Sequence, residues 1–181
     1  MTMNRMGLWL FFISESFLFS GIMVARMALL RDTRPNVDQN LGLGITAILL
    51  LSSFFANRGE VAIAHGDRGN FLFSIFLTIA LGIVFTVGVG YEWSLAFEHA
   101  NPTESVHGAI FFFMTGMHAA HVISGIIFLL VVFRNGLKGV YSKASHWGVE
   151  SCVLYWHFVD VVWVFFYVAL YLVGTVPEVI H

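Results

Sequence analysis

The chain has little charge and almost no cysteine or proline, and these shortages exclude several classes of protein. Charged residues make up 11% of its 181 residues, whereas a soluble domain carries about 25%. The single cysteine, Cys152, excludes an internal disulfide, and its place in an apolar segment is typical of a small buried side chain. The formal net charge of −2 gives no sign of a nucleic-acid partner.

Long apolar stretches take the place of the missing charge. Hydrophobic residues make up 58% of the chain, and the mean hydropathy is +0.82. About 20 apolar residues suffice to cross a bilayer as a helix. The sequence has four stretches of that length and a shorter one at residues 41–56, without the alternation of membrane β-strands. We therefore expect an all-α integral membrane bundle of five transmembrane helices, forming one domain over residues 1–181. The expected spans are residues 7–30, 41–62, 70–91, 104–133 and 147–173.

Proline and polar residues indicate where these helices end. All three prolines, Pro35, Pro102 and Pro177, fall outside the apolar stretches. Asn101, directly before a proline, is expected to cap the fourth helix. The second span is long enough only if its helix continues into the more polar residues that start at Asn57.

Lysine and arginine are distributed unequally between the two sides of this bundle. Of the nine basic residues, one side receives Arg5, Arg58, Arg68, Arg134, Lys138 and Lys143. The other side receives Arg26, Arg31 and Arg34. Because basic residues favour the cytoplasmic side, we expect a cytoplasmic N-terminus and a C-terminus outside. Two interpretations of Arg26 are open: it snorkels to the interface, or it marks an early end of the first span.

Small residues recur every four positions on two of the expected helices. Helix packing in membranes relies on close backbone approach at such positions. They are therefore expected to pack helices and to bind nothing. They are Gly82, Thr86 and Gly90 in the third span, and Gly116, Ala120 and Ser124 in the fourth.

Glu15 is an acid in the middle of the first span. It lies about 12 Å along the helix from Gly7 at 1.5 Å per residue. Ser14 and Ser16 beside it can hydrogen-bond a carboxyl group, which is expected to be neutral in so dry a place. It is either a proton-exchanging or lipid-contacting group, or a protonated acid bonded to a neighbouring helix.

Further ionisable residues on the fourth and fifth spans can form an intramembrane polar seam. One interpretation is a network of hydrogen bonds between helices. Metal coordination is a second, because His-x-x-His with an acid has ligand spacing, although the paired Glu-x-x-His of di-metal bundles is absent. Haem ligation is a third, although stacked haems need histidines far apart along a helix. The seam consists of His118, His121, Glu150, His157 and Asp160.

Three motifs resemble one family. Residues 155–163, Tyr-Trp-His-Phe-Val-Asp-Val-Val-Trp, are similar to the last helix of cytochrome c oxidase subunit III. Residues 112–122 contain that family's Thr-Gly-x-His-Gly-x-His-Val pattern, with Ala119 where glycine is usual. Ser14 and Glu15 match a mid-membrane Ser-Glu pair, and the resemblance covers nearly the whole chain. The family commonly has seven helices, so this chain is expected to lack the first two, as short bacterial members do.

The resemblance implies an accessory, non-redox subunit of a haem-copper terminal oxidase. The complex would reduce oxygen to water and pump protons in aerobic respiration, in the plasma membrane of a bacterium. Haem and copper would belong to partner subunits I and II, with no cofactor in this chain. The chain would stabilise subunit I, bind structural phospholipid and support proton uptake, with Glu15 as the family's buried carboxyl. A larger respiratory supercomplex is a further partner that the resemblance allows.

Alternatives to this interpretation fall in different classes. Within the family, the chain could serve a quinol oxidase or resemble the subunit-III-like protein of nitric oxide reductase. Outside it, a small transporter or a membrane cytochrome b would be the alternatives, although inverted repeats and broken helices typical of transporters are not evident. The sequence has no nucleophile–base arrangement, phosphate loop or CxxC motif, so we expect no catalysis by the chain alone.

Overall fold

Five long helices account for most of the chain in the computed structural model, which describes residues 3–99, 102–103 and 105–176. The helices are α1 (Met3–Leu30), α2 (Gln39–His65), α3 (Arg68–His99), α4 (Val106–Leu137) and α5 (Trp147–Tyr167), with a π-helical continuation η1 (Val168–Leu172). All five are long and apolar enough to cross a membrane, and the described residues contain no extended strand. The prediction of an all-α bundle of five transmembrane helices is confirmed.

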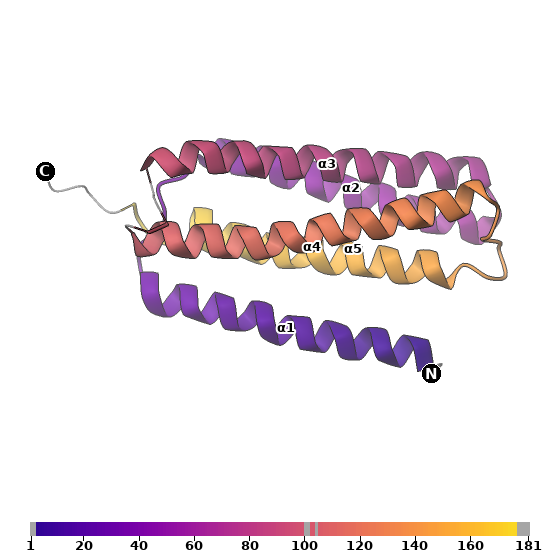
Figure 1. The fold of residues 1–181 in the computed structure, drawn as a ribbon, viewed down its shortest axis with the longest axis horizontal. Helices are drawn as coiled ribbons and strands as arrows, with labels where there is room; N and C mark the ends of the chain where they lie inside the picture. Colours follow the sequence, from indigo (N-terminus) through magenta and orange to yellow (C-terminus); the bar gives the residue numbers. More distant parts are fainter. Residues whose placement is uncertain (1–2, 100–101, 104, 177–181) are drawn as a thin grey trace, which may run out of the picture.

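Four of the helices form a bundle, and α1 lies beside it. In the bundle, α2 packs on α3, α3 on α4, α4 on α5, and α5 on α2, which closes the ring (Figure 1). The main contacts of α1 are with α4 and α5, and they are far sparser. Thus α1 is attached to one side of a complete four-helix core.

The helix ends follow local capping chemistry rather than hydropathy. Asp38 caps α2 by accepting hydrogen bonds from the backbone, and the helix continues through the polar stretch at Asn57 to His65. Helix α4 begins at Val106, where the Ser105 hydroxyl accepts a hydrogen bond from the backbone of Gly108. The prediction that Asn101 caps this helix is therefore wrong: the cap lies further along the chain, and Asn101 itself is outside the described residues.

Two tryptophans of α5 fill the centre of the bundle. The Trp156 indole donates a 3.0 Å hydrogen bond to the Ser52 hydroxyl on α2. Its ring lies so close to Gly82 on α3 and Gly125 on α4 that a Cβ atom on either glycine would come within 2.7 and 2.8 Å of it. Trp163 likewise donates to a threonine of α2. Glycine at these two sites is therefore required by the bulk of Trp156.

The small residues predicted to pack helices have divided roles. A Cβ atom on Gly82 would clash with the Trp156 ring, whereas a Cβ atom on Gly116 would lie in ordinary van der Waals contact with Trp93. Thr86 donates a hydrogen bond to the Gly82 carbonyl within its own helix. Gly90, in contrast, faces open space: a Cβ atom added there would meet no neighbouring atom within 4 Å, so this glycine packs against nothing in the described chain. A four-residue period identifies a helix face, but it does not tell which positions on that face meet a partner.

Arg26 connects the C-terminal part of α1 to the residue that follows η1. Its guanidinium is fully buried and donates to the carbonyls of Arg31 at 3.1 Å, Thr33 at 3.1 Å and Val173 at 2.8 Å. Thr33 also pairs with Thr175 in an isolated parallel bridge. Neither interpretation of Arg26 was right: it does not snorkel to solvent, and α1 continues past it to Leu30 because its charge is satisfied by carbonyls.

Candidate functional site: a carboxyl–imidazole pair in the membrane

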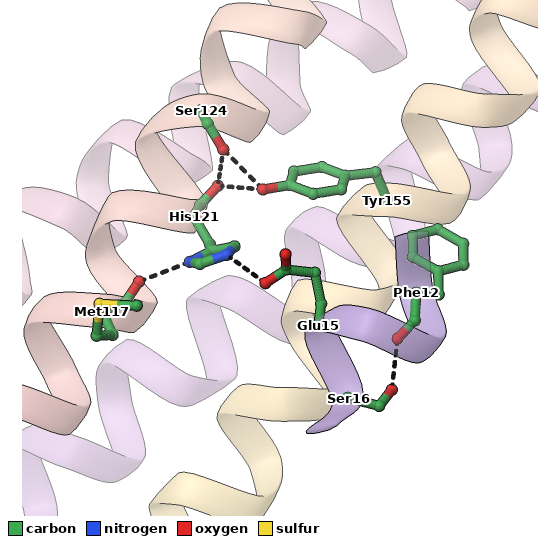
Figure 2. A network of polar contacts seen from close by, with 7 residues as sticks. All are labelled: Phe12, Glu15, Ser16, Met117, His121, Ser124 and Tyr155. Atoms are coloured by element: carbon green, nitrogen blue, oxygen red, sulfur yellow. Dashed lines mark hydrogen bonds and ion pairs between the residues drawn. The ribbon is translucent and has the colours of Figure 1, made fainter. Parts of the chain in front are cut away.

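Glu15 and His121 meet at the middle of their helices. An Oε atom of Glu15 on α1 lies 3.1 Å from Nε2 of His121 on α4 (Figure 2). Both side chains are mostly buried, with 19% and 17% of their surfaces exposed. Because α1 makes few other contacts with the bundle, this is a principal polar contact between α1 and α4.

The protonation of this pair can be argued from its partners. His121 Nδ1 lies 2.8 Å from the backbone carbonyl of Met117. A carbonyl only accepts hydrogen bonds, so Nδ1 carries a hydrogen and the imidazole presents Nε2 to the acid. Either a neutral His121 accepts the proton of a protonated Glu15, or a protonated His121 donates to an ionised Glu15. One proton is shared in both cases, so the pair can hold it without an isolated charge.

A second set of hydrogen bonds fixes the turn of α4 that carries His121. The backbone carbonyl of His121 accepts from the Ser124 hydroxyl at 2.8 Å and from the Tyr155 hydroxyl at 3.2 Å (Figure 2). These two hydroxyls also lie 2.6 Å from each other. The Ser16 hydroxyl, a predicted partner of Glu15, donates instead to the carbonyl of Phe12. The acid therefore relies on another helix rather than on the serine next to it.

The pair lies in the wall of an open hollow between α1, α4 and α5. This hollow has a volume of about 320 Å³, and its other lining residues include Phe11, Ala120 and Phe128. Ala120, predicted to pack helices, lines this hollow, and Ser124 does so as well. The carboxyl is thus reachable from the membrane side of the bundle.

Two further hollows flank α1, and both are mainly apolar. One, of about 470 Å³, is lined by residues such as Leu8, Val131 and Cys152. The other, of about 360 Å³, lies between α1 and α5 beside Met23 and Phe165. Apolar grooves of this size beside a loosely packed membrane helix suit acyl chains.

The five residues of the predicted seam do not join into one network among the described residues. His118 is fully buried, its ring is 4.7 Å from that of Trp163, and neither ring nitrogen has a hydrogen-bond partner. It stands three positions before His121, which on a helix turns the two side chains about 60° apart. His121 therefore faces α1, whereas His118 faces the aromatic core.

The three seam residues of α5 also have separate surroundings. Glu150 pairs with Arg5 at 3.1 Å and lies 3.4 Å from His146. His157 contacts the Ser53 hydroxyl through Nδ1. The buried Asp160 makes no hydrogen bond of ordinary geometry, although the Ser53 hydroxyl lies near its carboxyl group. No group of three or more His, Cys, Asp or Glu side chains suited to a metal ion occurs in the described part of the chain.

One buried acid was not predicted from the sequence. Glu92 on α3 is 2% exposed, and the hydroxyl of Tyr171 lies 2.7 Å from each of its carboxylate oxygens. In the sequence Glu92 stands just beyond the expected third span, where an acid is normally solvated. No spacing rule connects it to a tyrosine 79 residues away, so no signal in the sequence could have found this pair.

The fold and the site define a multi-pass membrane protein with a protonatable pair at mid-membrane. A model of the family "Cytochrome c oxidase subunit III" matches residues 2–175. Cytochrome c oxidase subunit 3 of Equus caballus is 35% identical over 184 aligned residues, which cover 94% of this chain and 70% of the relative. The corresponding subunit of a Synechocystis species is 34% identical over 178, covering 94% and 76%. The chain belongs to the cytochrome c oxidase subunit III family, whose members are subunits of a haem-copper oxidase.

Proposed function

We propose that the chain is a non-catalytic accessory subunit that supports proton uptake and long-term turnover of a haem-copper oxidase. The observation that carries this proposal is the Glu15–His121 pair at mid-membrane, which shares one proton and opens onto a membrane-facing hollow. Haem and copper belong to subunits I and II, where oxygen is reduced to water. The chain packs against subunit I and holds no redox centre of its own.

The geometry supports a role in holding a proton rather than in covalent chemistry. Met117 fixes the hydrogen on Nδ1 of His121, so only Nε2 and the Glu15 carboxyl exchange a proton. Tyr155 and Ser124 fix the backbone that carries the imidazole. The field of neighbouring subunits then decides whether the shared proton lies on the carboxyl or on the imidazole.

Structural phospholipid is the second part of the proposal. The two mainly apolar hollows beside α1 have volumes of about 470 and 360 Å³. Acyl chains in these hollows would cover the exposed face of α1 and the hollow that leads to Glu15. The surroundings are a bacterial plasma membrane, with the N-terminus in the cytoplasm.

Two substitutions at Glu15 test the proton-holding role. Glu15→Gln keeps a hydrogen-bonding group facing His121 but cannot ionise, and Glu15→Ala removes the group. If proton exchange matters, both variants assemble with the oxidase, and both lose proton uptake or inactivate sooner during turnover. Oxygen consumption over many turnovers and proton release from reconstituted vesicles are the measurements. Wild-type rate, proton stoichiometry and lifetime in both variants would reduce Glu15 to a structural residue.

Optical and elemental analysis of the purified chain tests the absence of a redox centre. We expect no Soret band and no stoichiometric metal. A Soret band, or about one equivalent of metal per chain, would instead favour a membrane cytochrome or metal site.

A further inference from the structure

A line of polar groups follows the packed pair of helices α2 and α5. On α2, Ser53, Asn57 and Glu60 recur every three or four residues and so share one face. On α5, His157 contacts Ser53, and Glu150 lies within electrostatic range of Glu60. Helix α2 ends where α5 begins, so the two series run side by side from the N-terminal end of the bundle to its middle (Figure 1).

Part of this line lies at the depth of the hydrocarbon core. Ser53 is near the midpoint of α2, and His157 is about 15 Å along α5 from Trp147 at 1.5 Å per residue. The hydrocarbon core is about 30 Å thick. Asn57, one turn from Ser53, is therefore also within the membrane.

Several groups of the line have hydrogen-bonding capacity that the chain does not use. His157 Nδ1 contacts Ser53, but Nε2 has no partner among the described residues and is not enclosed by protein. Asn57 is exposed, and neither its side chain nor the half-buried carboxylate of Glu60 makes a hydrogen bond or ion pair within the described chain. Lipid tails cannot satisfy such groups, so another molecule must do so.

The residues beside the line suit a packed helix. Leu50 and Phe54 on α2 are large, apolar and exposed. A second membrane helix laid along this face of α2 and α5 would cover them and bring polar side chains to the line. Glu60 makes no hydrogen bond or ion pair in the described chain, although His146 lies within electrostatic range. It favours a partner with a basic or hydrogen-donating group over a second copy of the chain, which would face one Glu60 with another.

We propose that the polar face formed by Ser53, Asn57 and Glu60 on α2 and His157 on α5 is where a transmembrane helix of a different subunit docks. That helix supplies a hydrogen-bonding side chain at mid-membrane depth and a basic or donor group nearer the N-terminal end of the bundle. This inference rests on the proposed function, since it requires that the chain work inside a membrane complex.

Photo-crosslinking in the intact complex tests the proposal directly. A benzophenone amino acid is placed at Asn57, and at Val87 on α3 as a control, because Val87 is 67% exposed on a different helix. We expect Asn57 to crosslink to another subunit and Val87 to give much less of that product. A crosslink from Asn57 only to lipid or to a second copy of the chain, or none at all, would overturn the proposal.

Removing polarity from this face of α2 is the second test. Asn57→Leu changes an exposed side chain, so the chain should fold, and Val87→Leu is the matched control. Loss of one interhelical hydrogen bond should lower recovery of the chain with the oxidase after mild detergent extraction by up to about tenfold. Full recovery of Asn57→Leu would contradict docking here.

The two proposals fail in different ways. Glu15→Gln tests the proton role in a complex that stays assembled, whereas Asn57→Leu tests assembly with Glu15 intact. Normal assembly of Asn57→Leu together with impaired turnover of Glu15→Gln would overturn the docking surface and leave the proposed function standing. Lost assembly of Asn57→Leu together with unaltered turnover of Glu15→Gln would overturn the proposed proton role and leave the docking surface standing.

Discussion

The Tyr171 hydroxyl lies 2.7 Å from both carboxylate oxygens of Glu92, although 79 residues separate them in sequence. Tyr171 belongs to η1, at the end of the last helix, and Glu92 to α3. The backbone carbonyl of Tyr171 also accepts a hydrogen bond from Gln39, and its ring covers Gly42, both at the start of α2. One tyrosine thus joins three elements at the end of the bundle remote from the N-terminus.

Tyr171→Phe should destabilise the chain by about 1–3 kcal/mol, because it leaves a buried carboxyl without its hydrogen-bond partner. Thermal unfolding in detergent is the measurement. Tyr167→Phe is a matched control, since its ring stacks on Tyr171 at 5.0 Å but its hydroxyl is not bonded to Glu92. Equal melting temperatures for the two variants would show that the contact with Glu92 contributes nothing.

Gly125→Ala should destabilise the bundle by about 1–3 kcal/mol through overpacking. The added Cβ would lie 2.8 Å from a ring atom of Trp156, which is buried and cannot move aside. Gly90→Ala is the control, because a Cβ there meets nothing within 4 Å, and alanine is the better helix former. We expect Gly90→Ala to unfold at or above the wild-type temperature, and a loss of stability equal to that of Gly125→Ala would contradict the packing described for Trp156.

Asp67 should make stability depend on pH. It lies between α2 and α3, where its carboxylate accepts hydrogen bonds from the backbone and side chain of Asn70 at 3.0 and 2.6 Å. These bonds hold the pKa of Asp67 below its ordinary value. A lowered folded-state pKa means that the stabilisation is present above the unfolded-state pKa of about 3.9 and is lost as the pH falls through the folded-state value.

Asp67→Asn therefore removes a pH-dependent stabilisation and keeps an oxygen acceptor. Melting temperatures between pH 7 and pH 3 should fall more for the wild type than for this variant, so that the two converge in acid. Parallel curves over the whole range would show that the Asn70 contacts do not depend on the charge of Asp67.

Membrane orientation is open to a labelling test. Asn36 is exposed between α1 and α2, and Val140 is exposed between α4 and α5, at opposite ends of the bundle. In a Cys152→Ala background, an impermeant thiol reagent outside intact cells should label Asn36→Cys and spare Val140→Cys. Labelling of Val140→Cys alone would reverse the predicted topology.

The five helices could be predicted from the sequence because a bilayer demands length and apolarity, and both are local properties. Glu15 could be singled out in the same way, as an acid in an apolar run. Its partner could not, since spacing placed His118 and His121 on one helix without telling which of them faced α1. The rotation of α4 is set by Trp156 and other residues of the core, far from either histidine in sequence.

The predicted seam shows the same limit. Sequence periodicity placed Glu150 and His157 on one face of a helix, and both do meet residues of other helices. Periodicity could not identify Arg5 as the partner of Glu150, or Ser53 as the partner of His157, because these two residues belong to α1 and α2. Contacts between distant segments depend on packing that no short window of sequence contains.

The buried Arg26 has a consequence for the order in which the chain is built. Its guanidinium needs the carbonyl of Val173, which is 147 residues later. During synthesis, α1 enters the membrane long before this carbonyl exists, and its end carries an incompletely satisfied cation until the last helix arrives. The first helix to be inserted should therefore be the last to reach its final position, and a chain truncated before Val173 should leave α1 open to chaperones and proteases.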